Sequence, residues 1–82
     1  MQVRAVFYGR LKTDTGTATC DLRLDGESIT VQDVVDALVA LYPALEPQLP
    51  TVAFAIGAAL VGRDAAVQDG DEVGLLPPVS GG

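Results

Sequence analysis

The chain ends on two glycines, Gly81 and Gly82, which follow a stiff segment containing Pro77 and Pro78. Glycine has no side chain, so a glycine pair can pass through a space that any Cβ would block. Ordering a glycine also costs more backbone entropy than ordering any other residue, so an exposed pair adds nothing to the stability of a fold. This ending predicts that the α-carboxylate of Gly82 is itself the reacting group and that it enters a narrow site on another protein.

Residues 79–82 form a short arm between the prolines and the terminus. An extended stretch of this length, starting at Val79, reaches about 13 Å, which is enough to enter a buried pocket. Pro77 and Pro78 restrict the backbone at the base of the arm and so reduce the entropy that the arm loses on insertion. We therefore expect a folded domain over residues 1–78 and a flexible reactive tail over residues 79–82.

Other residues offer little alternative chemistry. The chain has no histidine and one cysteine, Cys20, so we expect no metal site. Cys20 falls on the inward side of a predicted strand, which favours a buried structural thiol over a redox or sulfur-relay role. Asp69, Asp71 and Glu72 fall short of a calcium-binding EF-hand loop. A plain turn is the better interpretation of these acidic residues, with partner docking second.

Composition limits the partners and the compartment. The chain has 82 residues, of which 49% are hydrophobic and 20% are charged, as expected for one small folded domain. Its net charge of −6 disfavours nucleic acid and anionic membranes and favours a partner with a basic face. The lone cysteine and the lack of a secretion signal or a membrane-spanning apolar run predict a cytoplasmic protein.

Two stretches near the N-terminus alternate between apolar and polar residues with the period of a β-strand. The first covers residues 2–8 and the second covers residues 17–24. The polar, glycine-bounded residues 9–16 between them predict a hairpin loop. The residues expected to face inward are Val3, Ala5, Phe7, Ala18, Cys20, Leu22 and Leu24.

A helix is predicted after the second strand. Thr30 is a favourable N-cap, Asp33 completes a capping box, and Pro43 ends the helix. Residues 43–50 contain three prolines and predict a linker-like loop. The apolar stripe of the helix consists of Val31, Val34, Val35, Leu38, Leu41 and Tyr42.

The rest of the chain carries three further strand signals, over residues 52–56, 59–61 and 72–76. Residues 63–68 are expected to be irregular or to form a single turn, and residues 69–71 are expected to form a tight turn. In the last strand, Val73 and Leu75 are expected to point inward and Leu76 outward.

The order of these elements is β-β-α-β-β-β, with one main helix that covers one face of a mixed sheet. The first and last strands carry continuous apolar faces, so we expect them to pair in the centre of the sheet. This arrangement is typical of an α+β fold, and it indicates a ubiquitin-like β-grasp roll.

Three apolar residues, Tyr8, Leu60 and Leu76, are expected on the sheet face that points away from the helix. If their strands are neighbours, these side chains form an exposed apolar patch beside the tail. Scattered apolar residues are common on protein surfaces. A contiguous patch on a small domain, however, indicates a binding surface, and we interpret these residues as a docking patch.

The C-terminal region resembles a known family. Its motif is Asp69-Gly70-Asp71-Glu72-Val73, two further residues, and then Leu76-Pro77-Pro78-Val79-Ser80-Gly81-Gly82. This motif is similar to the C-terminal signature of ubiquitin-like sulfur carriers, above all the small subunits of molybdopterin synthase. The opening Phe7-Tyr8-Gly9-Arg10-Leu11 also resembles that family's first strand and loop. One departure lies in residues 56–61, where the family often has an asparagine before the strand.

The resemblance implies a chemistry for the tail. An E1-like enzyme would adenylate Gly82 with ATP, and sulfur would then replace AMP to leave a thiocarboxylate on Gly82. This group would deliver sulfur to a cyclic pterin precursor inside the large subunit of molybdopterin synthase, in a complex expected to be a heterotetramer. The chain itself would be a non-catalytic carrier with no bound cofactor. Its partner contacts would come from Pro77, Pro78, Val79, Ser80 and Gly81 together with the docking patch.

Other functions remain open at this point. A ubiquitin-like modifier that is conjugated to lysines would use the same tail, because its chemistry also begins with adenylation. A sulfur carrier for thiamine, cysteine or thiolated tRNA would share the fold and the Gly-Gly end. The Pro-Pro run and the chain length favour the molybdopterin synthase subunit, and a binding domain with an incidental tail is the weakest reading.

Overall fold

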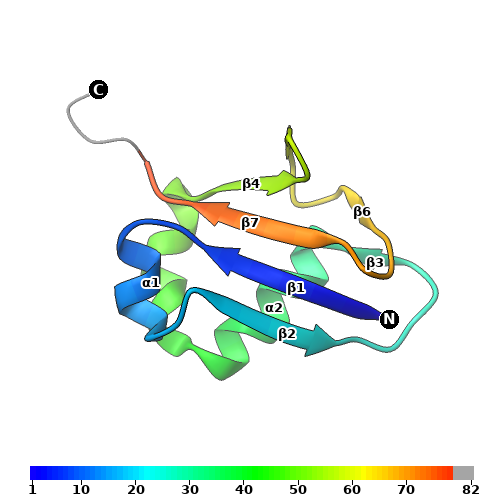
Figure 1. The fold of residues 1–82 in the computed structure, drawn as a ribbon, viewed down its shortest axis with the longest axis horizontal. Coiled ribbons are helices and arrows are strands. Elements are labelled where there is room, and N and C mark those ends of the chain that lie inside the picture. Colours follow the sequence, from blue (N-terminus) through cyan, green and yellow to red (C-terminus); the bar gives the residue numbers. More distant parts are fainter. Residues whose placement is uncertain (79–82) are drawn as a thin grey trace.

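A computed structural model of the protein describes residues 1–78. Within this range, five strands form a mixed sheet in the order β2-β1-β7-β4-β5 (Figure 1). β1 and β7 pair in parallel at the centre, and the other neighbours are antiparallel. The predicted mixed sheet and its central pairing are therefore confirmed. The strands are β1 (Gln2–Phe7), β2 (Thr19–Arg23), β4 (Ala53–Ile56), β5 (Ala59–Val61) and β7 (Glu72–Leu76).

The main helix, α2, spans Val31–Leu41 and begins at the predicted capping box. The backbone N–H of Thr30 donates to Asp33 Oδ2 at 2.9 Å, and the backbone N–H of Asp33 donates to Thr30 Oγ1 at 3.4 Å. These reciprocal bonds satisfy backbone donors that the first helical turn leaves without intrahelical partners. Pro43, which cannot continue an α-helix, follows shortly after the helix ends.

A second, two-stranded sheet lies next to the start of α2. It pairs β3 (Ile29–Thr30) with β6 (Ala66–Val67) in antiparallel orientation. The backbone N–H of Val31 also donates to the carbonyl oxygen of Ala65 at 3.0 Å. The expectation that residues 63–68 are irregular was therefore wrong for β6. A two-residue strand has too few positions to show alternation, so its existence depends on the partner that tertiary folding supplies.

Residues 9–16 do not form the expected hairpin loop. They contain helix α1 (Arg10–Thr15), which ends at Gly16 in the left-handed conformation with φ 78°. The Leu11 side chain is 0% exposed, so the helix is attached to the core by its one buried residue. An isolated helix of this length is not stable in water. The prediction failed because packing of Leu11, rather than local sequence preference, forms this helix.

The proline-rich segment after α2 is also more ordered than predicted. It forms a 3₁₀ helix, η1 (Pro43–Thr51), instead of a linker-like loop. Leu45 and Leu49 are both buried in the core cluster. Their spacing of four residues was the available signal, but the surrounding prolines concealed it.

The core lies between the inner face of the large sheet and the helices α1, α2 and η1. In Figure 1, α2 passes behind the strands and α1 lies at the end of β1. Most residues predicted to face inward are buried in this core. Ala18, in contrast, is exposed, because β2 begins one residue later, at Thr19. Leu41 is also 58% exposed, because it lies at the end of α2, beyond the edge of the core. The buried residues that confirm the inward face are Val3, Ala5, Phe7, Leu22, Val73 and Leu75.

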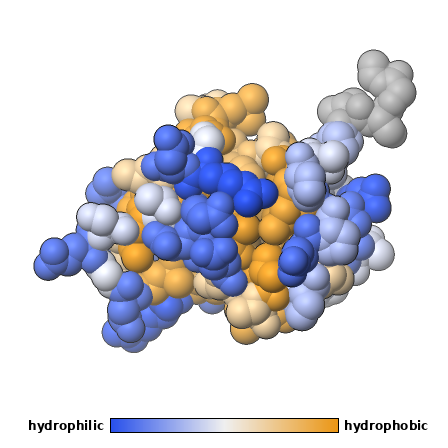
Figure 2. Space-filling view, turned by 180° about the vertical axis from the view of Figure 1, so that it is seen from behind, coloured by the Kyte–Doolittle hydropathy of each residue, from blue (hydrophilic) through white to orange (hydrophobic). Residues whose placement is uncertain are grey.

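Figure 2 shows the opposite side of the molecule, where hydrophilic side chains dominate the surface and an apolar strip is visible between them. A groove between α2 and η1 has Val35, Val39, Leu49 and Pro50 among its lining residues. Among residues 1–78, no helix has both the length and the apolar character needed to cross a membrane.

The role assigned to α1 can be tested with Leu11→Ala. We expect this change to lower the free energy of unfolding by about 2–5 kcal/mol, because it leaves a cavity in the core. Lys12→Ala is the matched control: it alters the neighbouring, exposed residue of the same helix and should change stability by less than about 0.5 kcal/mol. Urea denaturation of both variants measures the difference. Equal stabilities would show that α1 is not packed on the core.

Candidate docking face and C-terminal site

The base of the C-terminal tail lies against the turn between β1 and α1. The backbone N–H of Tyr8 donates to the carbonyl oxygen of Leu75 at 3.2 Å, which extends the β1–β7 pairing. Gly9 has φ 56°, and a Cβ added to it would lie 3.0 Å from Pro77 Cγ. Pro77 is half-buried and Pro78 is exposed. The chain therefore leaves the sheet at the end where β1 stops and α1 begins.

The residues predicted to react lie outside the described part of the chain. Val79, Ser80, Gly81 and Gly82 all follow Pro78, at which the structural description ends. The reactive carboxylate and the boundary between domain and tail thus stay predictions.

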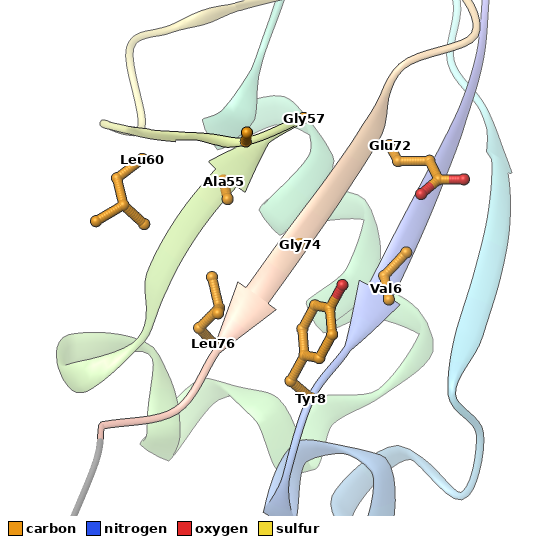
Figure 3. A pocket seen from close by; sticks show the side chains of 9 residues that line it. Val6, Tyr8, Ala55, Gly57, Leu60, Glu72, Gly74 and Leu76 are labelled. Carbon is orange, nitrogen blue, oxygen red and sulfur yellow. The ribbon is translucent and has the colours of Figure 1, made fainter.

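The three residues of the predicted docking patch line one hollow of about 300 Å³ on the outer face of the sheet. Tyr8 directly follows β1, Leu60 belongs to β5 and Leu76 belongs to β7, as Figure 3 shows. Tyr8 is 48% exposed and Leu60 is 74% exposed, whereas Leu76 is half-buried. Their spatial grouping follows from the strand order, and their role in docking stays a prediction. We call this feature the outer hollow; its other lining residues are Val6, Ala55, Gly57, Ala58, Glu72 and Gly74.

Small residues in the central strands create the outer hollow. Gly74 pairs with Val6 on one side and with Ala55 on the other, and Ala55 pairs with Leu60. A Cβ added to Gly74 would lie 3.2 Å from Tyr8 Cε2, so the tyrosine ring packs over the bare backbone of β7. Glycine in a strand interior often marks such a close approach. Gly74 and Ala55 therefore form the floor of the outer hollow, and larger side chains form its walls.

Sequence reasoning missed most of this floor, although signals for part of it were present. Val6 alternates with Ala5 and Phe7 and therefore had to face outward. Gly74 lies between the inward residues Val73 and Leu75, so alternation also places it on the outer face. The strand register that places these positions beside each other could not be predicted from the sequence.

Charged residues lie at the other end of the same face. Arg4 Nε and Asp21 Oδ1 form an ion pair at 2.8 Å. This hydrogen bond, followed by the Coulomb attraction of Asp21, holds the pKa of Arg4 above its ordinary value. Arg4 also pairs in register with Glu72, which lines the outer hollow. Because these side chains are exposed, the ion pair adds little to stability and mainly determines the local charge pattern.

Cys20 is half-buried in β2 and packs against the core. Its inward direction is confirmed, but full burial is not. A side-chain interaction with Cys20, followed by burial, raises the pKa of Tyr42 above its ordinary value. Within residues 1–78, no three His, Cys, Asp or Glu side chains are grouped so that they could hold a metal ion.

Comparison with known proteins identifies the family. The ThiS family matches residues 6–82 of the chain. The molybdopterin synthase sulfur carrier subunit of Chlamydomonas reinhardtii is 30% identical over 84 residues, which is 100% of both chains. The crystal structure of SAMP1, a small archaeal modifier protein, from Haloferax volcanii has a TM-score of 0.90 at 30% identity and covers 100% of both chains.

A third similarity involves a complex. One chain in the protein–protein complex of subunits 1 and 2 of molybdopterin-converting factor from Helicobacter pylori has a TM-score of 0.72 at 25% identity, with 100% of both chains covered. The fold predicted from the element order is the fold of these relatives. With its central parallel strand pair, capped helix and outer hollow, this chain belongs to the ThiS family of ubiquitin-like, β-grasp sulfur carriers.

Proposed function

We propose that this chain is the sulfur-carrying small subunit of a molybdopterin synthase and that it carries sulfur on the C-terminal carboxylate of Gly82. The observation that best supports the proposal is the position of the outer hollow. Tyr8 and Leu76 line it, and the next residue, Pro77, leads into the tail. A partner that covers the hollow is thus positioned to receive the tail. The full-length similarity to the Chlamydomonas subunit supports the same assignment.

The proposed chemistry begins with activation of a poor acyl donor. An E1-like enzyme joins the Gly82 carboxylate to the AMP part of ATP and releases pyrophosphate. Reduced sulfur from a donor then attacks the acyl carbon and displaces AMP, which leaves a thiocarboxylate. In the large subunit, the thiocarboxylate sulfur is transferred to the cyclic pterin precursor, and water returns the terminus to a carboxylate.

In this scheme the chain supplies no catalytic side chain. Its contributions are the sulfur-bearing terminus, the docking face and the direction in which the tail leaves the sheet. ATP is bound by the activating enzyme, and we expect both steps to occur in the cytoplasm. The Helicobacter complex supports the requirement for a second subunit. A heterotetramer with the large subunit is the assembly that we propose.

The alternative is a protein modifier whose Gly82 forms an amide bond with lysines of other proteins. The similarity to SAMP1 is the specific observation that favours it. Both functions begin with adenylation of the same carboxylate, so they differ only in the nucleophile that attacks the adenylate.

A free C-terminus is the first testable requirement. A short tag after Gly82 should abolish sulfur transfer, because the α-carboxylate becomes an amide that cannot be adenylated. A tag before Met1 is the matched control. There the terminal amino group donates to the Leu24 carbonyl oxygen at 2.7 Å, and an amide N–H can keep this bond. An assay of sulfur transfer with both tagged proteins checks the expectation. Equal activities, with intact mass confirming that the C-terminal tag is still present, would refute the sulfur-carrier mechanism.

The outer hollow is expected to contact the large subunit. Leu60→Asp should weaken binding by about 1 kcal/mol or more, because it places a charge in an apolar interface. Leu41→Asp is the control, since it changes an exposed leucine in the helical layer, at 58% exposure compared with 74% for Leu60. Calorimetric titration of the large subunit measures both affinities, and thermal melting tests the folding of each variant. If both changes weaken binding equally, the outer hollow is not the docking site.

Carrier and modifier can be separated by the fate of Gly82. In protein isolated from its own cell, we expect an intact mass that shows exchange of one oxygen for sulfur, located on Gly82. Peptide mass spectrometry of the whole proteome should then find no Gly82 joined to lysine side chains. Abundant lysine adducts without any thiocarboxylate would instead establish the modifier function.

A further inference from the structure

The outer face of the sheet has an apolar end and a charged end. Arg4 stands opposite Asp21 on β2 and opposite Glu72 on β7, so the three residues form a row across neighbouring strands. Figure 3 shows Glu72 at the end of the outer hollow that lies away from Tyr8 and Leu76. The apolar end thus adjoins Pro77, which follows Leu76, and the charged row lies farther along the strands.

Most carboxylates near this row already bind groups of the same chain. Asp21 forms its ion pair with Arg4. Asp69 Oδ1 accepts the backbone N–H of Gln2 at 2.6 Å, and Asp71 Oδ2 accepts the backbone N–H of Gln68 at 2.8 Å. These last two bonds support the prediction that residues 69–71 form a turn.

Glu72 differs from these neighbours. It is exposed, and within residues 1–78 its carboxylate forms neither a hydrogen bond nor an ion pair. It lines both the outer hollow and the adjacent polar hollow of about 240 Å³ around Arg4 and Asp21. Glu72 is therefore an available negative charge at the boundary between the apolar and charged ends of the face.

We propose that Glu72 is the orientation-determining contact of the docking face and that it pairs with a lysine or arginine of the large subunit, placed beside the apolar surface that fills the outer hollow. The inference rests on the proposed function and adds the chemistry of the partner surface to it. Burial of an apolar hollow is non-directional and leaves the rotation of the carrier undetermined. A charge pair at one end of the hollow selects one rotation, in which the tail points into the partner.

The charge of the whole chain supports this choice. A net charge of −6 attracts a basic surface at long range, so complementary charges raise the rate of encounter. Arg4 is a poorer candidate for the decisive contact, because its guanidinium is already paired with Asp21 at 2.8 Å. A basic group on the partner therefore meets Glu72 without displacing an ion pair of the carrier.

Charge reversal tests the proposal. Binding of Glu72→Lys and Glu72→Gln to the isolated large subunit is measured as association rate and Kd, from about 0.05 M to about 1 M NaCl. At the lowest salt concentration, Glu72→Lys should lower both the association rate and the affinity by about tenfold or more, and Glu72→Gln by less. The difference from wild type should shrink at high salt, because screening removes the lost attraction and the new repulsion.

Glu46→Lys is the matched control, because it makes the same change in net charge at an exposed glutamate of η1, in the helical layer. It should leave Kd within about twofold of wild type. Equal losses for the two reversals would show that net charge alone acts, and a loss in Glu72→Lys that persists at high salt would indicate a steric cause. Wild-type affinity in Glu72→Lys would also overturn the proposal.

The outcome is separable from that of the proposed function. Wild-type protein that binds the large subunit and transfers sulfur, together with an unaffected Glu72→Lys variant, would overturn the role of Glu72 alone. Wild-type protein that does not bind the large subunit would overturn both. Thermal melting verifies that each variant is folded, and the nearly isosteric Glu72→Gln keeps the test valid if the lysine variant is unstable.

Discussion

The parallel pairing of β1 and β7 is the interaction on which the other features depend. It joins strands from opposite ends of the sequence, and the backbone hydrogen bond from Tyr8 to Leu75 continues it beyond the last ladder pair. Their inward side chains, including Phe7, are buried at the centre of the core. Because the strands are parallel, both end at the same edge of the sheet. The chain therefore leaves the sheet beside the turn that leads into α1, where Pro77 packs against Gly9.

Residues 1–78 cover one face of this sheet and leave the other face uncovered. In the described part of the chain, α1, α2 and η1 all lie on the inner side, where they bury the core (Figure 1). The outer side carries Tyr8 and Leu60 in partly exposed positions around the low floor at Gly74. An exposed apolar hollow on an uncovered sheet face is the kind of surface that proteins use for binding. The charged row of Asp21, Arg4 and Glu72 borders the apolar part of this face.

Local sequence patterns were sufficient to locate the longer strands and the main helix. Period-two alternation located β1 and β7, and the Thr30–Asp33 capping box located the start of α2, because these signals depend on residues close together in the chain. The short elements α1, η1, β3 and β6 were missed or misread. Each is too short or too rich in proline to be stable alone, and each forms where a buried leucine or a neighbouring strand supports it.

The sequence alone contained the Gly81-Gly82 ending on which the proposed chemistry depends, the strand faces of Tyr8, Leu60 and Leu76, and most of the order of elements. Only the tertiary structure showed that these three side chains surround one hollow and that Gly74 forms its floor. It also showed that, within residues 1–78, the Glu72 carboxylate has no hydrogen-bond or ion-pair partner, whereas Asp69 and Asp71 accept backbone hydrogen bonds. The reason is physical: alternation specifies the face of a strand on which a side chain lies, whereas its neighbours across the sheet depend on strand order and register. Those depend in turn on long-range burial that a local pattern does not encode.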